Sequence, residues 1–155
     1  MAQHLWLLRH GEAEPHDPGA DDTRRLTDRG RDQSRAAGRA LAALGIEFQL
    51  VFTSPKLRAL ETAQLACEAL GGEPVEHAPL RVGFEHSHAL ELLSAAGDDQ
   101  RVLIVGHEPD FSQVVHDFTG ARIDLKKGGV AGLRVAGTAG ELLVLLRPRE
   151  LDRIG

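Results

Sequence analysis

Two short runs of apolar residues set the strongest limit on how this chain can fold. Leu5 to Leu8 and Val102 to Val105 are apolar at every position, whereas a strand with one face in solvent alternates apolar and polar residues. Strands that are apolar on both faces are typical of a parallel sheet with helices on both sides. Because helical patterns separate the predicted strands, we expect an α/β fold, a three-layer αβα sandwich with a mostly parallel central sheet.

Capping residues mark the first two helices. Thr27 is a suitable N-cap for a helix that runs to about Leu44 and stops at Gly45. Ser54-Pro55 is the preferred pairing of N-cap and first helical residue, so we expect the second helix to begin there and to end at Gly71-Gly72.

The middle of the chain continues to alternate predicted strands with predicted helices, whereas the last part contains two predicted strands in succession. Further strands are expected at Leu50 to Thr53 and within EPVEHAPL, and further helices in HSHALELLSAA and from Pro109 to Gly120. Val130 to Val135 and Leu142 to Leu146 have strand character and are joined by a turn with glycine. We therefore expect an antiparallel edge hairpin at the carboxyl end of the sheet.

Length and composition indicate one globular domain. A chain of 155 residues can bury its own core, so residues 1–155 are expected to form a single domain. The hydrophobic fraction is 42%, and no apolar run approaches the roughly 20 residues of a membrane helix. No secretory signal is recognisable, so we expect a cytoplasmic protein without a membrane partner.

The charged residues argue against a nucleic-acid partner and are compatible with binding of an oxyanion. A net charge of −5 disfavours binding to nucleic acid, which needs a concentrated basic surface. Lysine is limited to Lys56, Lys126 and Lys127, so most positive charge lies on guanidinium groups, which can grip an oxyanion with two hydrogen bonds. Cys67 is the sole cysteine and is expected to be a small residue of a helix core.

Polar residues follow three of the predicted strands at the point where each strand ends. Arg9-His10 follows the first strand, Ser54-Pro55 with Arg58 follows the second, and His107 follows the strand that ends near Val105. Carboxyl ends of parallel strands and amino ends of the following helices open on one side of the sheet, where ligands bind. The sequence therefore predicts a pocket for a phosphoryl group, built from two arginines and two histidines.

These segments together resemble the histidine phosphatase superfamily, which has the phosphoglycerate mutase-like fold. LLRHGEAE is similar to its signature around the nucleophilic histidine, TSPKLRALETA to its second arginine motif, and VGHEPDFS to its second histidine motif. The short length, RRLTDRGRDQS and DLKKGGVAGLRV look most like the small SixA-type phosphohistidine phosphatases within the superfamily.

The resemblance implies a role for each residue of the predicted pocket. His10 would attack phosphorus and carry the phosphoryl group until water hydrolyses it, while Arg9, Arg58 and His107 would bind the phosphoryl oxygens. Arg24, in the RRLT segment, is a weaker candidate for the rim of the pocket. His10 must be neutral to attack, and an ordinary histidine pKa near 6.5 would suffice at physiological pH.

The leaving group points to the substrate. An alcohol leaving group needs a general acid, whereas the imidazole of phosphohistidine departs neutral without one if its other ring nitrogen carries a proton. Larger family members supply the acid from an insertion, but the corresponding region here is short, and Glu85 and Glu12 are the nearest candidates. We therefore favour phosphohistidine on a phosphorelay or carrier protein, with inorganic phosphate as product and no metal or other cofactor.

Two alternatives remain open at this point. The chain could be a broad-specificity phosphatase of small phosphorylated metabolites, with Glu85 as the acid. It could also be a non-catalytic phosphoprotein-binding module, although a module of that class need not keep a nucleophile. The sequence does not indicate an oligomeric state.

Overall fold

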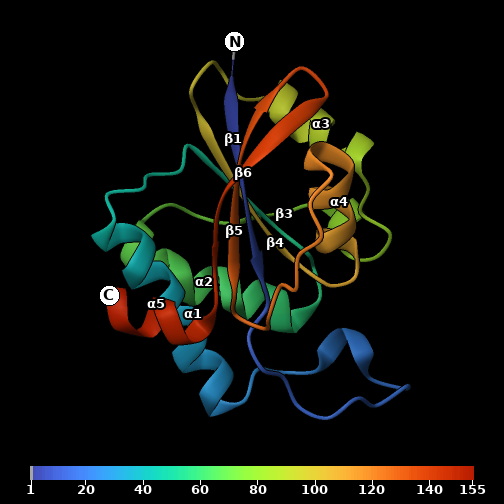
Figure 1. Cartoon of the computed structure of the whole chain (residues 1–155). Coiled ribbons are helices and arrows are strands. Elements are labelled where there is room, and N and C mark those ends of the chain that lie inside the picture. The colour runs from blue at the N-terminus through green and yellow to red at the C-terminus, as the bar shows by residue number, and fades with distance from the viewer. Residues whose placement is uncertain (1) are drawn as a thin grey trace.

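The computed structural model of this chain describes residues 2–155. Its centre is a sheet with strand order β3-β2-β4-β1-β5-β6 (Figure 1). The strands are β1 (Gln3–Arg9), β2 (Leu50–Thr53), β3 (Val75–Glu76), β4 (Arg101–Gly106), β5 (Val130–Ala136) and β6 (Ala139–Leu146). Strands β3, β2, β4 and β1 are parallel, whereas β5 and β6 are antiparallel to their neighbours. The predicted parallel sheet with an antiparallel edge hairpin is confirmed.

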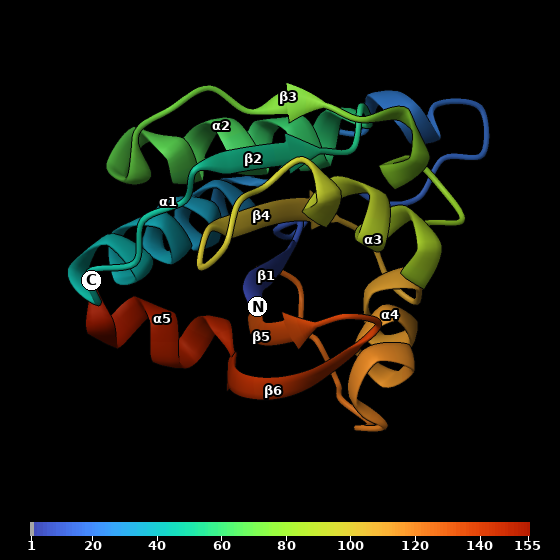
Figure 2. The same cartoon turned by 90° about the horizontal axis from the view of Figure 1, so that it is seen from above.

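Helices cover both faces of the sheet, as Figure 2 shows. On one face lie α1 (Asp28–Ala43), α2 (Leu57–Leu70) and α5 (Pro148–Ile154), and on the other lie α3 (His86–Ser94) and α4 (Asp110–Thr119). No helix within residues 2–155 is both long and apolar enough to cross a lipid bilayer.

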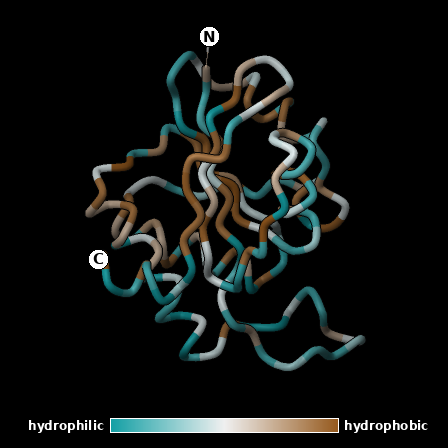
Figure 3. The backbone as a smooth tube through the Cα atoms, in the orientation of Figure 1, coloured by the Kyte–Doolittle hydropathy of each residue, from teal (hydrophilic) through white to brown (hydrophobic). Residues whose placement is uncertain are grey.

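The two faces explain why β1 is apolar at every position. Leu5 and Leu7 pack with Phe111 and its neighbours on α4, whereas Trp6 and Leu8 pack with small residues of α1 and α2. Figure 3 shows apolar residues concentrated in the central strands and a hydrophilic loop between β1 and α1. Each successive side chain of the strand therefore enters one of two separate cores.

Helix α1 begins directly after Thr27 and α4 ends directly before Gly120, as predicted, but α2 begins later than predicted. Thr27 caps α1 by accepting a hydrogen bond of 3.1 Å from the N–H of Gly30. The second helix begins at Leu57 rather than at Pro55, so the predicted start is wrong by two residues. The Ser54 hydroxyl accepts from the N–H of Lys56 at 3.2 Å and thereby closes a local turn instead of a helical cap.

The carboxyl-terminal helix α5 is not among the predicted elements. It has seven residues, too few for a helical repeat to show, and Leu151 is its single buried residue. That side chain packs in the same core as α1 and α2. Helix α5 therefore sits beside α1 (Figure 2). Arg147 and Arg149 line a cleft together with Arg9, the last residue of β1.

Candidate active site

The carboxyl ends of β1, β4 and β2 bring the predicted site residues together. In the sheet, Arg9 is opposite Gly106, and Thr53 is opposite Val105. The next residue of each strand continues this alignment, because the N–H of His10 donates to the carbonyl oxygen of Gly106 at 3.1 Å. His10 and His107 consequently face each other with ring centroids 5.3 Å apart.

His10 is a buried, neutral imidazole whose orientation is fixed by its own backbone. Its Nδ1 lies 2.7 Å from the carbonyl oxygen of Gly11, and because a carbonyl can only accept, Nδ1 carries the proton. The lone pair is therefore on Nε2. Burial, with the charges of Arg58 and Arg9, lowers the pKa of His10 to about 3. The expectation of an ordinary histidine pKa is thus corrected, because the side chain is only 6% exposed.

His107 has a similar environment on the next strand. Its Nε2 forms a hydrogen bond of 2.7 Å with the hydroxyl of Ser54, and its buried Nδ1 has no partner within residues 2–155. Burial is the main cause that lowers the pKa of His107 to about 3, followed by the repulsion that a protonated His10 would exert and by the charge of Arg58. The two rings therefore contribute no charge of their own at neutral pH.

The two arginines supply the positive charge of the site. Arg9 donates from Nη1 to the carbonyl oxygen of Leu125 at 3.0 Å, and Arg58 donates from Nη1 to that of Asp21 at 2.8 Å. In the described part of the chain, the buried Nε of each guanidinium has no hydrogen-bond partner. Buried donors are normally paired, so these groups are suited to an anion.

Arg24 joins this site through a carboxylate that the sequence analysis did not single out. Asp21 lies 3.2 Å from Arg24, 2.6 Å from Lys56 and 3.5 Å from Arg58. The Lys56 ammonium beside it is the largest cause that holds the pKa of the Asp21 carboxyl far below its usual range. Lys56 could have been noticed because it stands two residues before Arg58, whereas no local signal marks Asp21.

Glu85 is not brought to this site. It is the N-cap residue of α3, where its backbone N–H donates to Nδ1 of His88 at 3.0 Å. It lines a separate cavity with residues such as Asp110 and Gln113. The other candidate, Glu12, accepts from the hydroxyl of Thr27 at 3.0 Å and lines a cleft that includes Arg9. Within residues 2–155, no three His, Cys, Asp or Glu side chains form a group that could hold a metal ion.

The loop that carries His10 rests on a packed support that the sequence analysis also missed. The N–H of Gly11 donates to the hydroxyl of Thr62 on α2 at 3.1 Å. A Cβ atom at position 11 would lie 2.5 Å from the carbonyl oxygen of Gly30 on α1. Glycine is therefore needed here because the loop packs directly on α1.

A family profile and two curated proteins match this chain in sequence. The profile described as histidine phosphatase superfamily (branch 1) matches residues 5–81. An uncharacterised protein of Picosynechococcus sp. is 34% identical over 95% of this chain and 98% of its own length. The mitochondrial serine/threonine-protein phosphatase Pgam5 of Drosophila virilis is 48% identical over 41% of this chain. This chain spans 22% of that larger protein.

Structural comparisons extend the likeness over nearly the whole chain. The protein histidine phosphatase SixA in complex with tungstate has a TM-score of 0.83 at 22% identity, covering 96% of this chain and 99% of SixA. The alpha-ribazole phosphatase from Shigella flexneri has a TM-score of 0.75 at 18% identity, covering 94% of this chain and 96% of its own. These likenesses confirm the expected phosphoglycerate mutase-like fold.

Proposed function

Because this chain belongs to the histidine phosphatase superfamily, we propose that it is a phosphatase that uses His10 as nucleophile and hydrolyses phosphohistidine on a protein. The observation that carries this proposal is the state of the His10 ring. Its Nδ1 proton is committed to the carbonyl oxygen of Gly11, and burial keeps the ring neutral, so Nε2 has a lone pair ready for attack.

The proposed reaction has two displacements at phosphorus. The substrate phosphohistidine reacts with a proton on its other ring nitrogen. Nε2 of His10 forms a bond to phosphorus while the bond from phosphorus to the substrate imidazole breaks, and that imidazole takes the electron pair and departs neutral because it already carries this proton. His10 then carries the phosphoryl group on Nε2 and a proton on Nδ1, so its ring is positive and is stabilised by the Gly11 carbonyl. Water attacks the phosphorus, the bond to Nε2 breaks, and neutral His10 and inorganic phosphate result.

The other groups of the site stabilise the charge of the phosphoryl oxygens. Arg9 and Arg58 keep a fixed positive charge beside His10, and each guanidinium retains donors beyond the single hydrogen bond made by Nη1. We assign the donor role in the Ser54–His107 hydrogen bond to the serine hydroxyl. The neutral ring of His107 then has its proton on Nδ1, where it can donate to a phosphoryl oxygen.

The position of Glu85 disfavours the metabolite phosphatase that would use Glu85 as its acid, and so favours phosphohistidine as the substrate class. Glu85 is the N-cap residue of α3, and it lines a cavity that contains none of the four proposed catalytic residues. A phosphate ester would need an acid for its alkoxide, whereas imidazole leaves without one. The steps use protein groups only, so we expect a chelator such as EDTA to leave the rate unchanged.

The nucleophile is tested by trapping the intermediate. The wild-type protein and the variants His10→Ala and His116→Ala are mixed briefly with a phosphohistidine peptide, quenched in base and analysed by mass spectrometry for an acid-labile phosphoryl group. His116 is the control because it is an exposed histidine on α4. We expect the phosphoryl label on the wild-type protein and on His116→Ala, but not on His10→Ala. A phosphoryl label on His10→Ala would overturn the assignment of His10 as the nucleophile.

The substrate class is tested by comparing turnover. We expect kcat/KM for a phosphohistidine peptide to exceed that for sugar phosphates by at least about 10²-fold, the factor that a general acid commonly supplies. Faster hydrolysis of sugar phosphates would favour the metabolite phosphatase. Binding of phosphohistidine without turnover would favour a non-catalytic module.

A further inference from the structure

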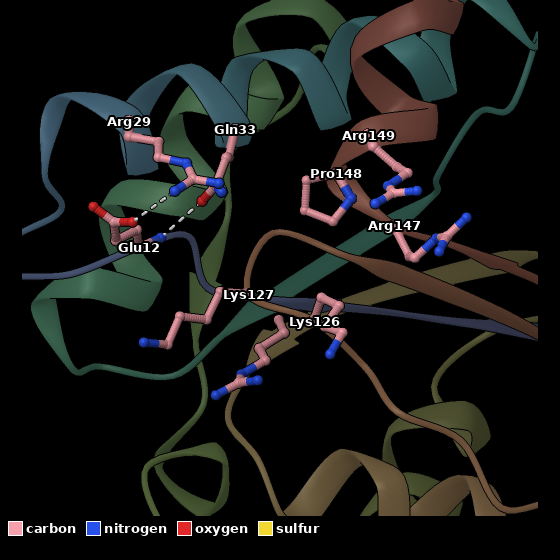
Figure 4. A pocket seen from close by; sticks show the side chains of 9 residues that line it. Glu12, Arg29, Gln33, Lys126, Lys127, Arg147, Pro148 and Arg149 are labelled. Carbon is pink, nitrogen blue, oxygen red and sulfur yellow. Dashed lines mark hydrogen bonds and ion pairs between the residues drawn. The ribbon is translucent and has the colours of Figure 1, made fainter.

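A cleft of about 460 Å³ beside the site is lined mostly by cationic side chains (Figure 4). Arg29 lies on the α1 side, Arg147 and Arg149 lie at the start of α5, and two lysines come from the loop before β5. The cations are Arg9, Arg29, Lys126, Lys127, Arg147 and Arg149, and Glu12 is the one carboxylate among the described residues that line the cleft. Four segments far apart in the sequence thus converge on one basic surface.

The cleft is joined directly to the proposed catalytic strand end. Arg9 lines the cleft and belongs to the site. The N–H of Gly128 donates to the carbonyl oxygens of both Arg9 and His10 at 3.0 Å, which holds the adjacent lysines against the strand end. The charge of Lys127 contributes to lowering the pKa of His10, as expected for a cation close to the ring. A group bound in the cleft would therefore be a near neighbour of a phosphoryl group on His10.

Half of the cations in the cleft have no carboxylate to neutralise them. Arg29 lies 3.5 Å from Glu12, Lys126 lies 2.7 Å from Asp124, and Arg147 lies 2.8 Å from Glu150. The remaining cations, for which residues 2–155 provide no ion pair with a carboxylate, are Arg9, Lys127 and Arg149. This local excess of positive charge stands out on a chain whose net charge is −5.

The character of the lining favours a protein surface over a small molecule. Small-molecule sites enclose most of their ligand, whereas long arginine and lysine side chains make up most of the described residues that line this cleft. The side chains of Arg29, Lys126 and Arg147 are 75%, 56% and 51% exposed. Long, solvated cations at the rim of a site are suited to steer and orient a partner with an acidic surface.

We infer that this cleft is a docking surface for acidic residues that flank the phosphorylated histidine of the substrate protein. The inference rests on the proposed function, because it names the partner of the same site. The acidic side chains would pair with Arg149, Lys127 and their neighbours while the phosphoryl group enters between Arg9 and Arg58. The cleft would thus select among phosphohistidine proteins by the charge around the modified residue.

The probes are two synthetic peptides with one histidine each, phosphorylated with phosphoramidate. In one peptide four flanking residues are aspartate or glutamate, and in the other the same positions are asparagine or glutamine. We expect kcat/KM of the wild-type protein to be about ten-fold higher for the acidic peptide at low salt, chiefly through a lower KM.

The variant Arg149→Glu reverses one unpaired charge of the cleft and is expected to reduce this preference to about two-fold or less. The matched control is Arg153→Glu, which makes the same change one turn later on α5, at an exposed arginine that does not line the cleft. The control is expected to keep the ten-fold preference. Circular dichroism of both variants shows whether α5 and the rest of the fold are intact.

The outcomes separate this inference from the proposed function. The docking surface is overturned if the wild-type protein hydrolyses both peptides with equal kcat/KM. It is also overturned if Arg153→Glu loses as much of the preference for the acidic peptide as Arg149→Glu does. Neither result contradicts the proposed phosphatase activity. Hydrolysis of neither peptide overturns both. Tripolyphosphate tests whether the cleft instead binds a small polyanion. If it inhibits the wild-type protein strongly and Arg149→Glu weakly, and the wild-type protein does not prefer the acidic peptide, the cleft is a site for a small polyanion and the inference is overturned.

Discussion

Among single residues, the two buried histidines make stability depend on pH on the acid side of neutrality. Burial lowers the pKa values of His10 and His107 to about 3, below the ordinary value of 6.5 that they regain on unfolding. As pH falls from 6.5 toward 3, the unfolded state binds protons that the folded state does not, so the folded state loses stability. Above pH 6.5 the two histidines have no effect of this kind.

We therefore expect the free energy of unfolding to fall with decreasing pH less steeply in His107→Gln than in the wild-type protein. The difference in slope should approach about 1.4 kcal/mol per pH unit between pH 6 and pH 4, the value for one group that titrates only when unfolded. Urea unfolding at several pH values measures the slope, and His116→Gln is the surface control. Equal slopes for His107→Gln and the wild-type protein would show that His107 titrates normally when folded.

The Asp21 carboxylate competes with a bound anion for the cations of the site. It contacts Arg24, Lys56 and Arg58, whereas the hydrogen bond that positions Arg58 goes to the main-chain carbonyl of Asp21. Asp21→Asn therefore removes the charge and keeps that hydrogen bond. The three cations then act on a bound anion without a competing carboxylate.

We expect Asp21→Asn to bind inorganic phosphate about five-fold more tightly, a gain of about 1 kcal/mol. The inhibition constant of phosphate as a competitive product measures the effect. Asp22→Asn is the matched control, because Asp22 pairs with Arg81 at 2.6 Å on the exposed surface. Weaker phosphate binding in Asp21→Asn would mean that the carboxylate serves mainly to hold the arginines in place.

The helices and strands that could be predicted from the sequence are those marked by a local pattern of residues. Strands β1 and β4 could be predicted because they are apolar at every position, and α1 because Thr27 is a good N-cap. Helix α5 could not, since its one buried residue, Leu151, leaves no periodic pattern. Nor could the contact of Asp21 with Arg58, because it joins a loop to a helix 37 residues further along the chain.

Close packing of α1 on α2 depends on a glycine in the middle of α1. A Cβ atom on Gly38 would approach the Cα of Ala66 to 2.7 Å and its carbonyl oxygen more closely still. We expect Gly38→Ala to destabilise the protein by about 1–3 kcal/mol through this overpacking, against the roughly 1 kcal/mol that alanine gains in an isolated helix. Thermal unfolding tests this, with Gly97→Ala as control because the nearest atom there is 3.5 Å away. A stabilised Gly38→Ala would show that the two helices can move apart without loss.

In the molecule as a whole, positive charge is concentrated at the end of the sheet that holds His10, although the net charge of the protein is negative. The chain carries −5 in total, yet Arg9, Arg58 and Lys127 all act on His10 with positive charge. Such a field attracts anions from solution, and its reach depends on ionic strength. The basic cleft adds exposed charges to this field, whereas the buried arginines are shielded from salt.

Salt should therefore separate docking from chemistry. Screening lengths fall from about 30 Å at 0.01 M salt to about 10 Å at 0.1 M, so attraction between the exposed cleft and an acidic peptide weakens over this range. We expect kcat/KM for the acidic phosphohistidine peptide to fall about five- to ten-fold through a higher KM, while kcat stays nearly constant because the buried site is little screened. The neutral peptide should lose about two-fold or less in the same buffers. An equal loss for both peptides would place the salt effect at the phosphoryl group itself, where Arg9 and Arg58 act, and not in the cleft.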